Sequence, residues 1–301
     1  MHGLPFDRPG RFYRGNLHTH STRSDGTIAP EAVVAAYRER GYDFLALTDH
    51  FLPHYGYPIT DTRAWRDAGF TTLLGAELHA PALEVGEPWH IVAIGLPPDF
   101  APPDAAETGP ALAGRAAAAG AFVGMAHPAW YSLTLDDALA LEAAHAVEVY
   151  NLTCANLNDR ADSWHLAEML LARGRRLLAY AADDAHFTAR PDAFGAWVQV
   201  RAEALDPDAL LAALKAGHFY SSQGPELRDV AVQGDRLRVA CSPVDAIYLG
   251  GRRSPRAARF GDGLTAAEFA LAPFGGGYCR VTVVDGAGRR AWSNPIWLDA
   301  T

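Results

Sequence analysis

Short apolar runs alternate with Ala-rich helical stretches through the first three quarters of this 301-residue chain, and this alternation is the strongest constraint on its fold. Repeated strand and helix units predict a parallel sheet, and seven or eight strands close more economically into a closed or distorted TIM-like barrel than they spread into an open sheet. We predict strands at 13–17, 44–47, 71–74, 90–95, 121–125, 146–150 and 177–181, and helices at 30–40, 105–119, 135–143 and 156–173.

The pattern changes after Gly224-Pro225, where helical periodicity ends and short alternating strands follow at 229–232, 237–241, 246–249, 269–272 and 278–284. We therefore predict two domains, an α/β barrel over 1–224 and a small all-β, sandwich-like domain over 225–301. The charge divides at the same place: residues 1–224 hold 16 basic and 27 acidic side chains, and residues 225–301 hold 10 and 8. The excess of acid belongs to the predicted barrel.

Composition excludes several classes of protein. The net charge of -9 lacks the basic surplus that a phosphate backbone requires, so we expect no nucleic-acid partner. No apolar run is long enough to span a membrane, and the three cysteines form no CxxC pair, so we expect a soluble protein in the reducing cytoplasm. A single lysine, Lys215, argues against a P-loop or a lysine Schiff base.

Histidines and carboxylates gather where the predicted strands meet loops. Because strand ends converge on one face of a (β/α) barrel, these side chains would meet in one pocket. Taken singly, His90 or His127 would be a structural histidine and Asp25 before Gly26 a turn residue. Nine such residues together favour a shared metal site. The predicted ligands are His18, His20, Asp25, His50, Glu77, His90, His127, Asp184 and His186.

Six imidazoles and three carboxylates are more than one tetrahedral ion needs, and a carboxylate such as Glu77 can bridge two ions. We therefore expect two or three divalent metal ions, Mn, Zn or Fe. Such ions lower the pKa of a bridging water enough to supply hydroxide at neutral pH, which predicts a hydrolase.

The order of these motifs resembles the polymerase and histidinol phosphatase (PHP) domain superfamily over about three quarters of the chain. The resemblance rests on His18-x-His20, Asp25-Gly26, Thr48-Asp49-His50, Gly75-x-Glu77, His90, His127-Pro128 and Asp184-Ala185-His186. It implies a distorted (β/α)7 barrel with up to three metals and phosphoester hydrolysis. By position, His18, His20, Glu77 and Asp184 would hold one ion, Glu77, His90 and His127 a second, and Asp25, His50 and His186 a third.

The motifs around His18 and Asp25, with Tyr220 to Pro225 and Ala291 to Ile296, look like a subgroup of this superfamily that has an added C-terminal β-domain. That subgroup includes aryl N-methylcarbamate hydrolases. One departure from the family is Asp183, where a small hydroxyl residue is common, and its extra negative charge would disfavour an anionic substrate.

Five further residues are candidates for catalysis or for contact with the substrate. Asp49 and Asp183 are candidates for proton transfer, Arg23 for contact with a phosphate, together with Arg190, and His79 for contact with a ligand or the substrate. Aromatic residues at 51–57, 89, 130 and 131 would either pack normally or wall the pocket.

These observations predict a metal-dependent hydrolase of a small-molecule substrate, first a phosphoesterase acting on a small phosphorylated metabolite through a metal-bridging hydroxide. The alternative on the same site is a hydrolase of neutral aryl esters or carbamates, favoured by the sparse cations and the aromatic residues. A catalytically silent metal-binding or scaffold module is the alternative of another class. The sequence leaves a homo-oligomer open.

Overall fold

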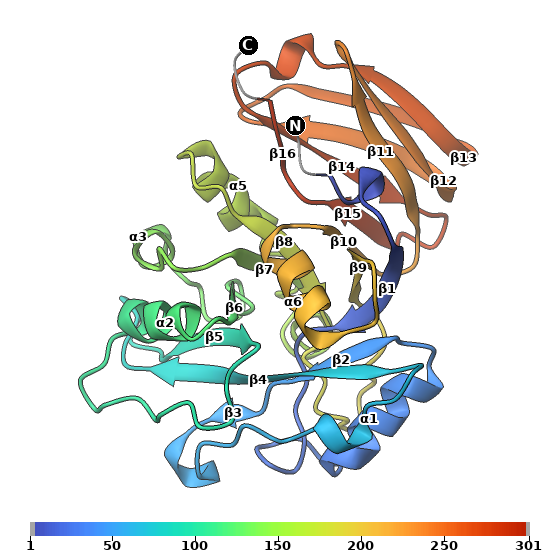
Figure 1. Cartoon of the computed structure of the whole chain (residues 1–301). Coiled ribbons are helices and arrows are strands. Elements are labelled where there is room, and N and C mark those ends of the chain that lie inside the picture. The colour runs from blue at the N-terminus through green and yellow to red at the C-terminus, as the bar shows by residue number, and fades with distance from the viewer. Residues whose placement is uncertain (1–3, 299–301) are drawn as a thin grey trace.

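The computed structural model describes residues 4–298. Figure 1 shows two parts: helices and shorter strands form the lower part, and long strands in orange to red form a twisted sheet above it. The strands of the lower part are β1 (Arg11–Asn16), β2 (Phe44–Leu47), β3 (His50–Phe51), β4 (Thr71–Ala80), β5 (Trp89–Ile94), β6 (Phe122–Met125), β7 (Ala146–Asn151), β8 (Leu178–Ala182), β9 (Trp197–Ala202) and β10 (Phe219–Ser222).

Within residues 4–298, six α-helices and four 3-10 helices accompany the strands. The α-helices are α1 (Pro30–Glu39), α2 (Gly109–Ala118), α3 (Leu135–Ala140), α4 (Leu152–Leu157), α5 (Trp164–Ala172) and α6 (Pro207–Lys215), and the 3-10 helices are η1 (Pro5–Asp7), η2 (Pro53–Tyr55), η3 (Arg63–Trp65) and η4 (Ala272–Phe274). Gly41 and Gly174 follow α1 and α5 with φ of 75° and 86°, the left-handed conformation that glycine adopts without strain. Both helix ends agree with the prediction.

The strands of the lower part form a mixed sheet in the order β10-β9-β1-β2-β4-β5-β6-β7-β8. The pairs β1–β2, β2–β4, β6–β7 and β7–β8 are parallel, as the repeated strand and helix units predict. The prediction of a parallel sheet is wrong at β5, which pairs antiparallel with β4 and β6. No strand was predicted at β9 or β10, and both pair antiparallel with their neighbours. A short loop, without a helix, joins β4 to β5, so the chain reverses direction there.

The two ends of this series approach each other through side chains. The hydroxyl of Ser221 on β10 accepts a hydrogen bond from Ala181 N at 3.0 Å and donates one to Ala179 O at 3.2 Å, both on β8. The side-chain oxygen of Asn294 accepts a further bond from Ala179 N. The fold is thus mixed α/β with parallel strands at its centre, while closure as a (β/α)7 barrel stays a prediction because side chains make this junction.

The predicted helix at 156–173 is wrong, because α4 and α5 are separate and residues 158–163 form a loop between them. This stretch reads Asn-Asp-Arg-Ala-Asp-Ser, and Asn, Asp and Ser side chains compete with helical hydrogen bonds. Asp159 has a φ of 59°, and the carboxylate of Asp162 accepts from Trp164 N to begin α5. The first of the two helices, α4, starts at Leu152, directly after β7 ends at Asn151.

The C-terminal strands are all antiparallel. They are β11 (Leu227–Gln233), β12 (Arg236–Gly251), β13 (Arg256–Ala270), β14 (Tyr278–Val284), β15 (Arg290–Ser293) and β16 (Ile296–Trp297). Two of the predicted strands, 237–241 and 246–249, are parts of the single long strand β12. Because β15 pairs with β10, these strands continue the hydrogen-bonded network of the lower part. A sandwich and a boundary at 224 and 225 stay predictions.

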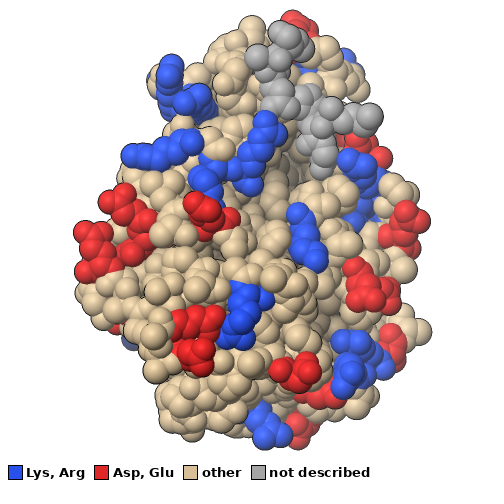
Figure 2. All heavy atoms as spheres, turned by 60° about the vertical axis from the view of Figure 1, so that its left-hand side comes forward, with Lys and Arg blue, Asp and Glu red and all other residues tan. Residues whose placement is uncertain are grey.

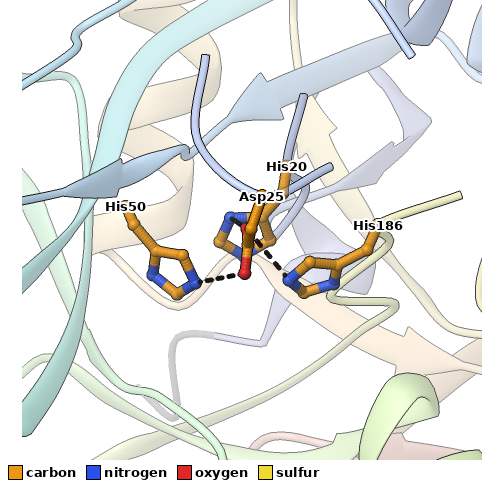
Figure 3. Close-up of side chains that lie close together, drawn as sticks. All are labelled: His20, Asp25, His50 and His186. Atoms are coloured by element: carbon orange, nitrogen blue, oxygen red, sulfur yellow. Dashed lines mark ion pairs between the residues drawn. The ribbon is translucent and has the colours of Figure 1, made fainter. Parts of the chain in front are cut away.

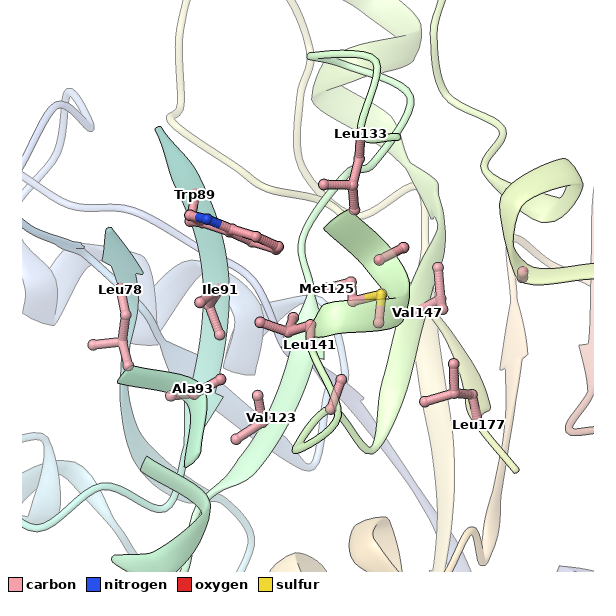
Figure 4. Close-up of a cluster of buried hydrophobic side chains, with 14 of the residues drawn as sticks. Leu78, Trp89, Ile91, Ala93, Val123, Met125, Leu133, Leu141, Val147 and Leu177 are labelled. Carbon is pink, nitrogen blue, oxygen red and sulfur yellow. The ribbon is translucent and has the colours of Figure 1, made fainter. Parts of the chain in front are cut away.

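Buried hydrophobic side chains form separate clusters in the lower part and among the C-terminal strands. Figure 4 shows the largest cluster, in which Leu78, Ile91, Val123, Met125 and other buried side chains pack between β4 to β8 and the helices beside them. Another cluster lies among β11 to β16 and includes Leu4 and Tyr220 from the other side of the predicted boundary. The three cysteines, Cys154, Cys241 and Cys279, are buried free thiols.

The surface in Figure 2 carries interspersed acidic and basic side chains. Within residues 4–298, no helix is both long and apolar enough to cross a bilayer.

Candidate metal centre

The fold brings all nine sequence-predicted ligands into one cluster. Each belongs to at least one of four groups of ligand atoms that lie within 4.8 Å of one another, and the groups share His18, His20, His50 and Glu77. The groups are His18, His20 and Glu77; His18, His127 and Asp184; His20, Asp25, His50 and His186; and His50, Glu77, His79 and His90.

The segments after β1 and β8 pair with each other and so place four of these residues. His20 N donates to Ala185 O at 2.8 Å, and Asp184 N donates to His18 O at 3.0 Å. In extended backbone, alternate side chains point to the same side. His18 and His20 therefore face Asp184, which adopts a strained φ of 57° at this point.

The facing ligand atoms of His18, His20 and Glu77, together with one oxygen of Asp184, are enclosed by the protein. His18 Nε2 lies 3.5 Å from Glu77 Oε2 and 3.3 Å from Asp184 Oδ1, and His20 Nε2 lies 3.5 Å and 2.9 Å from the same two oxygens. All four atoms are buried and have no hydrogen-bond partner. Buried polar atoms are rarely left unpaired, and a nitrogen and oxygen set of this kind is typical of a divalent metal site. The residues present therefore fit a metal ion.

Asp25 is the centre of the group that it forms with His20, His50 and His186 (Figure 3). Its Oδ2 lies 3.2 Å from His50 Nε2 and its Oδ1 lies 3.4 Å from His186 Nε2. The ring of His20 lies against that of His186 with a centroid distance of 4.2 Å. The three residues that the resemblance assigns to the third ion are thus adjacent to one another.

Glu77 joins the remaining ligands to the others. Its Oε1 lies 2.7 Å from His90 Nδ1 and 3.1 Å from His127 Nε2, while its Oε2 lies 2.7 Å from His50 Nδ1. This carboxylate therefore lies between the three predicted ligand sets, in the position of a bridging ligand. His79 Nε2 lies 2.8 Å from His50 Nδ1, so His79 is also within reach of the cluster.

The charges in the cluster keep its carboxylates ionised. Burial raises the pKa of Glu77 and Asp25, but the surrounding imidazoles outweigh burial and hold both pKa values below their usual range. Burial lowers the pKa of His50, but Glu77 and Asp25 outweigh it and raise that pKa to about 10. Burial and two neighbouring imidazoles lower the pKa of His20 to about 3, so its ring is neutral, as a metal ligand must be.

Asp49 and Asp183, the candidates for proton transfer, point at backbone and hydroxyl donors. Asp49 accepts hydrogen bonds from Ser21 N at 2.7 Å and from the hydroxyls of Ser21, Ser24 and Thr60. Asp183 accepts from the Tyr37 hydroxyl and from the backbone of residues 194–196, and burial raises its pKa to about 6. Asp49 thereby holds the loop that carries Asp25.

The two predicted phosphate-binding arginines lie outside the central cavity. Arg23 is exposed, and Arg190 donates to Asn156 O at 2.6 Å. The cavity has a volume of about 340 Å³, and among the described residues that line it none is Lys or Arg. Its lining residues are Asp25, His50, His90, His127, Trp130, Thr153, Leu157, Asp184, His186, Thr188 and Asp192.

Of the predicted aromatic wall, Trp130 alone lines this cavity. Phe51 and Tyr57 line a separate hollow of about 280 Å³ behind His79, and Trp89 is buried in the core. Tyr131 is buried against His90, with ring centroids 5.3 Å apart. Of the two alternatives predicted for these aromatic residues, ordinary packing therefore holds for Phe51, Trp89 and Tyr131. The ring of Tyr55 lies beside that of His50, with ring centroids 6.5 Å apart.

Sequence reasoning missed Glu148, whose Oε1 lies 3.0 Å from His18 Nδ1. It also missed Asn151, whose side-chain nitrogen donates to Asp184 Oδ2 at 3.1 Å. A signal for Glu148 was present, since it is the one charged residue of the buried strand β7, Ala-Val-Glu-Val-Tyr-Asn. Leu157 on the missed helix α4 had no such signal.

Known structures give the same picture of the fold. The chain is similar to a two-domain protein from Bacteroides vulgatus that contains a predicted PHP-like metal-dependent phosphoesterase, with a TM-score of 0.57 and 18% identity over 93% of this chain and 94% of that one. This likeness shows a shared fold. A candidate metal-dependent phosphoesterase from Bifidobacterium adolescentis has a TM-score of 0.42 and 18% identity over 67% of this chain and 96% of that one, too low a score to carry weight.

The sequence itself matches one family model. No curated protein matches the chain at a significant level. Residues 16–152 match the model of the PHP domain, from the last residue of β1 to the first of α4. Seven of the nine candidate ligands, His18 through His127, lie within these residues, and Asp184 and His186 join them in space. Residues 16–152 are therefore similar in sequence to the PHP domain.

Proposed function

We propose that this protein is a metal-dependent hydrolase and, more specifically, a phosphoesterase that acts on a small phosphorylated metabolite. One observation carries the proposal: four buried ligand atoms, from His18, His20, Glu77 and Asp184, converge without a hydrogen-bond partner in a chain whose residues 16–152 resemble the PHP domain. Burying such groups unpaired costs free energy that a bound cation would offset. The similar protein from Bacteroides vulgatus, which contains a predicted PHP-like metal-dependent phosphoesterase, supports the reaction class.

Two or three divalent ions, Mn, Zn or Fe, suit these nitrogen and oxygen donors. His18, His20, Glu77 and Asp184 would hold one, Glu77, His90 and His127 a second, and Asp25, His50 and His186 a third. When bound, such ions supply Lewis acidity and lower the pKa of water in the site.

The protein's own residues fix the geometry of this site. Glu77 orients His50, His90 and His127 around itself through contacts of 2.7 to 3.1 Å. Because the oxygens of Asp49 already accept hydrogen bonds from Ser21 and Ser24, we assign Asp49 to positioning the Asp25 loop. The ring of His79 beside His50 is the better candidate for proton exchange, since it lies in contact with the cluster.

The cavity wall favours a second candidate on the same metal site, hydrolysis of neutral aryl esters or carbamates. Trp130 and the half-exposed Leu157 line the cavity, and none of the lining residues described above is Lys or Arg. A doubly charged phosphate would therefore be neutralised by the metal ions alone, whereas an uncharged aryl group would pack on the indole and leucine side chains.

A rate comparison decides between these candidates. The protein is loaded with Mn or Zn, and turnover per bound metal is measured on an aryl phosphate, an aryl acetate and an aryl N-methylcarbamate. We expect phosphate turnover that His18→Ala abolishes and that His165→Ala, a change at an exposed histidine of α5, leaves intact. Cleavage of only the neutral substrates would replace the phosphoesterase assignment with the second candidate. A loaded protein inactive on all three would support a silent metal-binding module.

A further inference from the structure

We infer that Glu148 and Asn151 are positioning residues of the metal centre, which set the orientation of His18, His127 and Asp184 and thereby its affinity for divalent ions. This inference rests on the metal centre proposed above and extends it to two residues that offer no ligand atom. Both are buried, and both come from the end of β7, where the chain enters α4.

Glu148 binds two of the candidate ligands at once. Its Oε1 accepts from His18 Nδ1 at 3.0 Å, and its Oε2 accepts from His127 N at 2.6 Å and from Asn151 Nδ2 at 3.0 Å. A carboxylate at this distance keeps the proton of His18 on Nδ1. Nε2 then faces Glu77 Oε2 and Asp184 Oδ1, where the unpartnered atoms converge, and would offer its lone pair to a metal ion held there.

Asn151 closes a circuit of contacts around the same atoms. Its Nδ2 donates both to Glu148 Oε2 and to Asp184 Oδ2, at 3.0 and 3.1 Å. Asp184 Oδ1 in turn lies 3.3 Å from His18 Nε2. A rotation of any one side chain in this circuit would break a contact of its neighbour, so the four groups hold one arrangement.

The circuit also joins the metal centre to the wall of the cavity. Asn151 Oδ1 accepts from Cys154 N and caps α4, and the Thr153 hydroxyl donates to Asp184 O at 2.7 Å. Thr153 and Leu157 on α4 line the cavity. The residues that orient the ligands therefore also place the helix that contacts the substrate.

The test is the metal affinity of purified, metal-depleted protein, measured by competition with a chelator for Zn and for Mn. Glu148→Gln keeps the side-chain volume but turns one acceptor into a donor that faces the N–H groups of His127 and Asn151. We expect its Kd for metal to rise about 10- to 100-fold, as for other outer partners of metal ligands. The matched control is Glu168→Gln, whose carboxylate binds Arg280 and Tyr278 away from the site, and its Kd should not change.

Asn151→Ser tests whether the two residues act together, because serine can still cap α4 but is too short to join Glu148 and Asp184. We expect the double variant to weaken metal binding by less than the product of the two single effects. Thermal unfolding of each metal-free variant shows whether it is folded. A folded Glu148→Gln protein with unchanged Kd, or fully independent effects of the two substitutions, would overturn the inference. Because Kd is measured without substrate, a protein that binds metal but hydrolyses nothing contradicts the proposed function alone.

Discussion

The metal centre and the C-terminal strands differ in what they bury. Around the strand ends of the lower part, the buried side chains include those of His18, His20, Glu77, Glu148 and Asp184. Among the described residues after 225, the buried polar side chains are Thr282, Ser293 and Asn294, which carry no charge. Burying a charged side chain costs free energy unless the charge is paired or binds a metal. A functional site is therefore expected where several charged side chains are buried together. The C-terminal strands contain an ordinary apolar core.

The largest expected effect that tests this contrast is that of Glu77→Gln. Glu77 contacts His50, His90 and His127 and approaches the unpartnered nitrogens of His18 and His20, so losing its charge affects every predicted ion. We expect metal affinity and turnover to fall by more than the roughly 100-fold that loss of an outer partner costs. Chelator competition and initial rates measure both, with the exposed Glu142→Gln as control. Unchanged affinity would mean that the bridging position is wrong.

Ile247→Ala changes the apolar core of the C-terminal strands instead of the metal centre. Ile247 is fully buried among the C-terminal strands. Truncating such a side chain leaves a cavity and should lower the free energy of unfolding by about 2–5 kcal/mol, against about 0.5–1.5 kcal/mol for Ile247→Val. Urea denaturation measures the loss. The metal affinity of the folded protein should stay the same, and a weaker affinity would show that the two regions are coupled.

Metal removal should affect the stability that the metal centre contributes and leave the contribution of the C-terminal core unchanged. A metal ion at 100 times its Kd that binds only the folded protein should stabilise it by about 2.7 kcal/mol, and a chelator should remove that increment. We expect His18→Ala to lack the increment and Ile247→Ala to keep it. Thermal or urea unfolding with and without metal measures it, and an increment that survives in His18→Ala would contradict the assigned site.

The smallest expected effect is at the cavity wall. Leu157 is 53% exposed on α4, and Leu157→Ala removes part of its apolar contact with a bound substrate. We expect kcat/KM for aryl substrates to fall by about tenfold or less, since partial burial of a leucine is worth about 1 kcal/mol. Metal affinity should not change. The control is Val85→Ala, at an apolar side chain that is 48% exposed elsewhere, and equal effects of the two changes would remove Leu157 from the substrate site.

The sequence predicted the positions of helices and strands around the site better than it predicted the directions in which the strands pair. Apolar periodicity located α1, β2, β6 and β7 within one or two residues, because local pattern and helix-ending glycines decide these elements. The antiparallel direction of β5, the strands β9 and β10, and the break between α4 and α5 were not predicted. Strand direction depends on which neighbours a strand meets, and a single sequence does not contain that information.

For the site too, some features follow from the sequence and others only from the structure. The residue types and spacings of the nine candidate ligands follow from the sequence, because a metal requires specific donor atoms and strand alternation places them in pairs. Their role as ligands stays a prediction, while the structure shows that they are adjacent. Asp49 and Asp183 were candidates for proton transfer, yet the structure surrounds their oxygens with hydrogen-bond donors from residues 21–24 and 194–196.

By itself, then, the sequence determined which donor atoms this protein offers and its similarity to the PHP domain. The tertiary structure alone decided that Glu148 supports His18, that Asn151 joins Asp184 to α4 and that Phe51 and Tyr57 line a separate hollow. The reason is physical: a ligand's identity is a property of one residue, whereas its orientation depends on partners distant in the chain, 130 residues away for His18 and Glu148.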